Sequence, residues 1–99
     1  MDLLRRLQAW YDDSLPELQA EGCVVEFSEP VPKHPKPSAS VTVSSSSRIG
    51  KLTVWVTGEA ELDLGDAASG EVIGEHLEIS GDLGLADATR TLVAWVRGS

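Results

Sequence analysis

Three carboxylates alternate with apolar residues in the middle of the sequence. Glu59, Glu61 and Asp63 are separated by Ala60 and Leu62, a spacing that places the carboxylates on one face of a strand. Catalysis by paired carboxylates needs acids whose pKa values are driven apart, and no lysine or histidine neighbours these three in sequence. A calcium loop of the EF-hand type needs a different spacing. We therefore interpret the three carboxylates as a charged surface.

The other residues that commonly carry chemistry are isolated from one another. Cys23 has no histidine close in sequence, which is typical of a structural, apolar thiol. His34 lies among prolines and His76 in an alternating segment, each without a second ligand at metal-binding spacing. The glycines form no dinucleotide-binding or phosphate-binding motif. The sequence therefore predicts no catalytic residues, no metal and no cofactor, and we expect the protein not to be an enzyme.

Trp55 is the residue that stands out as a binding candidate. It lies between Thr53 and Thr57 on the polar side of an alternating segment, and the three carboxylates follow on the same side. A large aromatic side chain inside an acidic rim is typical of an interface anchor. The alternative is that Trp55 packs under a loop, such as the proline-rich stretch, or against a helix. The predicted partner-binding residues are Trp55, Thr53, Thr57, Glu59, Glu61 and Asp63.

The elements that must position these residues begin with a helical region over residues 2–21. Its apolar side chains recur at three- and four-residue spacing, and Asp2 could cap its start. Pro16 interrupts the pattern, and Ser14 matches the start of a capping box. The region is therefore either one helix or two short helices that meet near Ser14.

From Cys23 onward, apolar residues recur at every second position, which predicts a sheet over residues 23–79. A proline-rich loop over residues 30–38 interrupts it, because proline cannot join the interior of a sheet. A polyproline ligand for a recognition module is the functional alternative for this stretch. After a second strand, four serines lead into a turn through residues 48–50.

The clearest alternation runs over residues 52–64, with Gly58 in its middle. The segment is either one strand bent at Gly58 or two strands that turn there. A two-residue loop at Thr57 and Gly58 would place apolar Val56 opposite Glu59 and mismatch the two faces. The unbroken pattern therefore favours the bent strand.

Residues 71–79 are predicted to form the last strand, and helical spacing then predicts a helix over residues 82–97 that Ser80 or Asp82 caps. Short connections favour a mainly antiparallel sheet of four to five strands. We predict a single α+β domain over residues 1–99, with the N- and C-terminal helices packed on one face of this sheet. The expected core includes Leu7, Trp10, Leu52, Val54, Leu62, Leu92 and Trp95.

The charge balance restricts the class of partner. Sixteen acidic residues against eight basic ones give a net charge of -8. Such a field repels nucleic acid and anionic membrane surfaces and attracts basic protein surfaces, although small domains are also acidic for solubility alone. One cysteine and no apolar run of ~20 residues favour a cytoplasmic protein. We expect a basic protein partner, no nucleic acid and no membrane, with a monomer favoured.

The Val-Trp-x-x-Gly-Glu core within residues 52–64, followed by a turn, a strand and a short amphipathic helix, resembles the immunity proteins of bacterial polymorphic toxin systems. More narrowly, the chain is similar to the family called TriTu. Its members are understood to neutralise an ADP-ribosyltransferase toxin that attacks elongation factor Tu. The resemblance also rests on size, acidity and element order across most of the chain.

The resemblance implies a bacterial antidote that blocks the active cleft of its cognate toxin by stoichiometric binding. Carboxylates such as Glu59, Glu61 and Asp63 would suit a cleft whose cationic groups bind the phosphates of NAD. The alternatives are a secretion chaperone, which would wrap an unfolded effector segment, and a small-ligand-binding domain. A toxin gene immediately upstream would support the antidote, and a secretion-apparatus locus would support the chaperone.

Overall fold

Five consecutive strands lie between two helices in the chain. The computed structural model describes residues 2–29 and 36–98. The helices are α1 (Leu3–Ala20) and α2 (Asp82–Arg97). The strands are β1 (Val24–Ser28), β2 (Ser38–Ser44), β3 (Arg48–Trp55), β4 (Glu59–Asp66) and β5 (Val72–Glu78).

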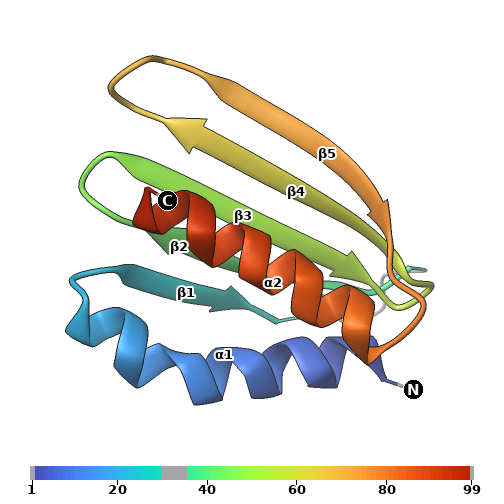
Figure 1. The fold of residues 1–99 in the computed structure, drawn as a ribbon. Coiled ribbons are helices and arrows are strands. Elements are labelled where there is room, and N and C mark those ends of the chain that lie inside the picture. The colour runs from blue at the N-terminus through green and yellow to red at the C-terminus, as the bar shows by residue number, and fades with distance from the viewer. Residues whose placement is uncertain (1, 30–35, 99) are drawn as a thin grey trace.

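The strands form one antiparallel sheet in which each strand pairs with the next along the chain, in the order β1-β2-β3-β4-β5 (Figure 1). At its centre, Leu52 of β3 pairs with Val41 of β2 on one side and with Leu62 of β4 on the other. This register places apolar side chains of successive strands on the same face. The predicted α+β fold with an antiparallel sheet is confirmed, with five strands.

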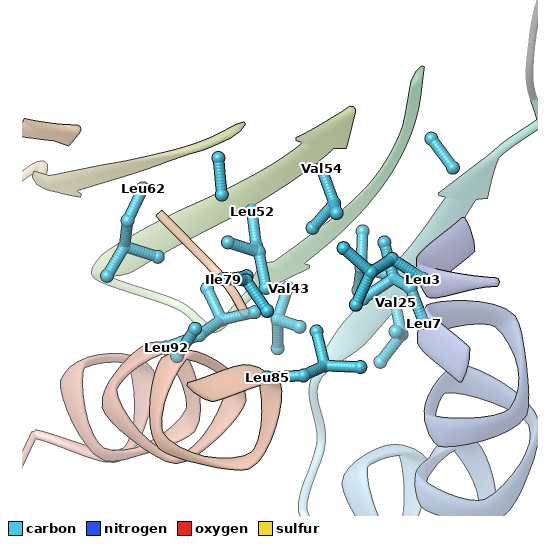
Figure 2. Packing of buried hydrophobic residues seen from close by; sticks show 14 of the residues in the cluster. Leu3, Leu7, Val25, Val43, Leu52, Val54, Leu62, Ile79, Leu85 and Leu92 are labelled. Atoms are coloured by element: carbon cyan, nitrogen blue, oxygen red, sulfur yellow. The ribbon is translucent and has the colours of Figure 1, made fainter. Parts of the chain in front are cut away.

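Both helices cover the apolar face of the sheet, as predicted (Figure 1). Leu7 of α1 and Leu92 of α2 are fully buried against strand residues such as Leu52 (Figure 2). Of the expected core residues, Trp10 and Trp95 are only half-buried, because each lies at the rim of a helix stripe and packs against the core from its edge. Neither described helix is long and apolar enough to cross a membrane.

The helical region at the start is one continuous helix. The Asp2 side chain accepts a hydrogen bond from the backbone N–H of Arg5 at 3.2 Å, which confirms the predicted cap. Pro16 lies inside α1 with an exposed side chain. Leu15 and Leu18 continue the apolar stripe on either side of it and pack against the core. Packing against the core therefore stabilises a continuous helix, although proline removes one backbone hydrogen bond from it.

The prediction of one strand bent at Gly58 is wrong, since β3 and β4 form a hairpin. Val54 pairs with Ala60, so that a three-residue turn over 56–58 joins Trp55 to Glu59. Gly58 has φ +98°, a left-handed conformation, and its N–H donates to the carbonyl of Trp55 at 2.9 Å. A three-residue loop keeps the alternation of faces intact, whereas the two-residue loop considered above would break it.

The serine-rich turn is shorter than predicted, because residues 48–50 already belong to β3. The turn lies at residues 45–47, where the N–H of Ser45 donates to the carbonyl of Arg48 at 2.8 Å. Gly50 pairs with Val43 and lies beneath Leu92 and Val96 of α2. A Cβ atom at Gly50 would lie 2.4 Å from Cδ1 of Leu92. Gly50 therefore serves close helix packing and not a turn.

The predicted cap of α2 is also wrong, since neither Ser80 nor Asp82 is the N-cap. Gly81 holds that position without a side-chain hydrogen bond. Asp82 is instead the first helical residue, where its charge lies near the positive end of the helix dipole. It also forms an ion pair with Arg6 of α1 at 3.0 Å, which links the starts of the two helices.

Three contacts hold the far end of α2. The Arg97 guanidinium donates to both carboxylate oxygens of Glu21, at 2.7 and 2.5 Å, and this hydrogen bonding lowers the pKa of Glu21. Trp95 Nε1 donates to the carbonyl of Gly65 at 3.1 Å, and the Arg48 guanidinium lies 4.3 Å from the Trp95 ring centroid. The tryptophan is thus a structural link between α2 and the sheet.

Candidate functional site

The side of the sheet that points away from the helices carries the predicted binding residues. We call it the open face and define it by the strand side chains that alternate with the buried ones. Thr53 and Trp55 reach it from β3, and Thr53 pairs with Glu61 of β4. Asp63 lies two residues further along β4, opposite Lys51. The open face therefore contains five of the six predicted residues, namely Thr53, Trp55, Glu59, Glu61 and Asp63.

Thr57 is the predicted residue that the strands do not place on this face. It is exposed in the turn between β3 and β4. The backbone there is fixed by Gly58, whose carbonyl accepts a hydrogen bond from the N–H of Ile79 at 2.7 Å. Thr57 therefore lies at the end of the hairpin, beyond the strand residues Trp55 and Glu59.

Trp55 is half-buried because the end of the proline-rich stretch lies against it. The Lys36 ammonium is 5.8 Å from the centroid of the Trp55 ring and bonds to a carboxylate oxygen of Glu59. The N–H of Val56 donates to the carbonyl of Pro37 at 3.0 Å. Part of the alternative interpretation of Trp55 therefore holds, since Lys36 partly covers the ring. Residues 30–35 of the predicted loop, His34 included, lie outside the described residues.

The charge of Glu59 is balanced within the protein. The hydrogen bond from Lys36 lowers the pKa of Glu59, and the nearby charge of His76 acts weakly in the same direction. Glu61 and Asp63 are more exposed than Glu59. These two carboxylates therefore present the charge of β4 to solvent more fully than Glu59 does.

Neighbouring strands add polar residues that the sequence did not identify as part of the site. Thr53 pairs with Ser40 of β2, which is buried, and Ser40 pairs with the exposed Ser28 of β1. On the other side, Glu61 pairs with His76 of β5. These five residues form one row across all five strands. The row depends on strand register, which alternation within one strand cannot specify.

A second row, at the end of the open face away from Trp55, is apolar. Val24, Ile49 and Val72 are 58%, 49% and 79% exposed. Only Ser44 and Gly65 separate them in the register. Exposed aliphatic side chains in one row are a feature of contact surfaces more than of solvated sheet faces. The open face thus combines a half-buried tryptophan, exposed carboxylates and an apolar margin.

The arrangement of residues on the open face suits the binding of a partner protein better than catalysis. Within residues 2–29 and 36–98, no group of three or more histidine, cysteine or acidic side chains could hold a metal ion. Cys23 is half-buried against the core and unpaired to another cysteine. Glu61 and Asp63 line a small hollow of about 260 Å³ together with Gly74, Glu75 and His76. Within the described part of the chain, its lining contains no serine, threonine, cysteine or lysine that could act as a nucleophile beside His76. What the open face offers a partner is an aromatic ring, negative charge and flat apolar area.

Comparison with models of known protein families identifies a family that covers most of the chain. A family model described as "Immunity protein TriTu" matches residues 5–95. No curated protein and no solved structure matches the chain. The matched range includes all five strands and therefore the whole open face.

Proposed function

The chain belongs to the TriTu immunity protein family, whose function is toxin neutralisation, and we propose that it acts by docking its open face on the active-site cleft of one cognate toxin. The observation that carries the proposal is the combination on one helix-free face of Trp55 with the exposed carboxylates Glu61 and Asp63. An aromatic anchor with a charged rim is the composition expected of a tight protein interface.

We propose further that the toxin is an ADP-ribosyltransferase, the class that the family resemblance implies. Such an enzyme binds NAD, whose phosphates require cationic or N–H groups in the cleft. Glu61 and Asp63 could bind those groups in place of the phosphates. Because the whole chain has a net charge of -8, it would also approach a basic cleft faster than a neutral protein would.

We expect neutralisation to be stoichiometric. The test uses the cognate toxin domain, NAD and elongation factor Tu as the acceptor. Modification of the acceptor should fall linearly as the protein is added and stop at a fixed molar ratio, about one to one for a monomer. Complete inhibition of many toxin molecules by one molecule of this protein would instead show turnover and reopen an enzymatic function.

The same titration separates the antidote from a secretion chaperone. A chaperone would bind an unfolded segment, so it would leave the activity of the folded toxin domain intact. Calorimetry with the folded, catalytically inactive domain should therefore show binding if the open face docks on the cleft. Binding only to urea-unfolded toxin would support the chaperone.

Charge reversal on the open face should act on the association rate. We expect the double change Glu61→Lys and Asp63→Lys to slow association on the order of tenfold at low salt, because it removes steering toward a basic cleft. The loss should shrink as salt shortens the screening length from ~10 Å at 0.1 M to ~3 Å at 1 M. Stopped-flow kinetics over this salt range measures it.

Asp12→Lys with Asp13→Lys is the matched control. Both residues are exposed on α1, on the helix side of the sheet, and the control changes the net charge by the same amount. Equal slowing by the two double variants would show that net charge matters and that the open face has no special role.

A further inference from the structure

β5 is a free edge of the sheet. In the strand order it is last, and no residue in the described part of the chain pairs with its outer side. It has seven residues against five in β1, the other edge strand, and all its side chains except that of Leu77 are exposed. Figure 1 shows β5 beyond the area that α2 covers. This edge is therefore long enough and open enough to pair with another strand.

The register identifies the backbone groups that point outward. The N–H of Ile79 donates to the carbonyl of Gly58, and the N–H of Asp66 donates to the carbonyl of Glu71. Hydrogen-bonded pairs alternate with non-bonded pairs in an antiparallel ladder, so residues 73, 75 and 77 direct their N–H groups toward β4. The outward N–H groups then belong to Val72, Gly74, His76 and Glu78.

A shallow groove runs beside this edge on the helix side. It has a volume of about 180 Å³, and its apolar lining includes Leu62, Leu77 and Ala88. Glu75 and Asp87 stand on its rim. A strand added to β5 would extend the sheet over this groove, and every second side chain of the added strand would face it.

The charges around β5 indicate which kind of strand could pair with this edge. Residues 52–89 contain nine carboxylates, of which Glu59, Asp66, Asp82 and Asp87 form ion pairs with cationic side chains elsewhere in the chain. Glu75 and Glu78 of β5 form no ion pair within the described residues. If two copies of β5 paired antiparallel about their centres, Glu75 would lie opposite Glu75 of the second copy, and like charges directly opposite are destabilising. The edge therefore disfavours a second copy of this chain and favours a strand that carries lysine or arginine.

We propose that an extended, lysine- or arginine-containing segment of the toxin pairs with β5 as a sixth strand. Its backbone would bond to the outward groups of residues 72, 74, 76 and 78. Its cationic side chains would face Glu75 and Glu78, and its apolar side chains would enter the groove beside Leu77. This inference rests on the proposed function and adds a second contact to the one made by the open face.

The test is His76→Pro with His76→Ala as its matched control. Both variants remove the imidazole, but only proline removes the outward N–H, and it leaves the hydrogen bonds to β4 in place. Affinity for a catalytically inactive form of the cognate toxin domain should be at least tenfold lower for the proline variant than for the alanine variant. Equal affinities of two folded variants would overturn the sixth-strand proposal.

Amide hydrogen exchange of the protein without substitutions gives a second test of the sixth-strand proposal. This test does not depend on whether the proline variant folds. The amides of residues 72, 74, 76 and 78 should exchange much more slowly in the complex than in the free protein. Unchanged exchange at these four positions would overturn the proposal. If the toxin is neutralised and Trp55→Ala weakens binding while these amides are unaffected, only the edge contact fails. If the unmodified protein does not bind the toxin, the proposed function fails as well.

Discussion

Trp55→Ala should weaken toxin binding by about thirtyfold or more, or about 2 kcal/mol, while the protein stays folded. Truncation of a hot-spot aromatic side chain in an interface typically costs this much. The ring lies on the open face, half-buried under Lys36, and outside the core between sheet and helices. Its loss should therefore lower the free energy of unfolding far less than the ~3 to 5 kcal/mol typical of a core tryptophan. Calorimetry and urea unfolding of the same variant measure the two effects.

Trp10→Ala is the matched control for this prediction. Trp10 is also half-buried, but it lies on α1 and packs against the core on the helix side. Its removal should lower stability and leave the affinity of the folded protein unchanged. If Trp10→Ala weakens binding and Trp55→Ala does not, the toxin docks on the helices and the open face is not the site.

Leu52→Ala should cost about 3 to 5 kcal/mol of the free energy of unfolding. Leu52 is fully buried at the centre of the sheet, between Val41 and Leu62, where the helices pack. Replacing leucine by alanine at such a site loses hydrophobic transfer energy and leaves a cavity that the neighbours only partly fill. Because small domains are stable by only about 5 to 15 kcal/mol, a large part of the total would be lost.

Urea unfolding followed by tryptophan fluorescence measures this change, with Thr53→Ala as the control. Thr53 is the next residue of β3 and points to the open face, so its truncation should cost less than about 1 kcal/mol. A loss below about 1 kcal/mol for Leu52→Ala would contradict the position of the core between β3 and the helices.

The strands could be predicted from the sequence because the alternation of apolar and polar residues along a strand is a local signal. This alternation assigned Leu52 to the core and Thr53 to the opposite face. It placed all six candidate binding residues on one face, whereas the structure keeps five of them there and places Thr57 in the turn. The hairpin at Gly58 was missed for a specific reason. Alternation continues unbroken through a loop with an odd number of residues, so a bend and a three-residue turn give the same pattern.

Contacts between distant segments could not be predicted in the same way. Lys36 reaches Trp55 and Glu59 from across the proline-rich stretch, and no local pattern indicates that pairing. The continuity of α1 through Pro16 likewise depends on packing with the sheet, which overrides a local helix-breaking signal. The row from Ser28 to His76 needed the register of all five strands.

The sequential strand order also has a kinetic consequence. Every strand pairs with its neighbour along the chain, so most of the sheet can form by closing short loops, at a small cost in chain entropy. A low relative contact order of this kind predicts faster folding than that of barrels or sandwiches with distant strand pairings. The contacts of α1 and α2 with the sheet join segments that lie further apart in the chain. A protein that must meet a toxin soon after both are made would benefit from this short folding time.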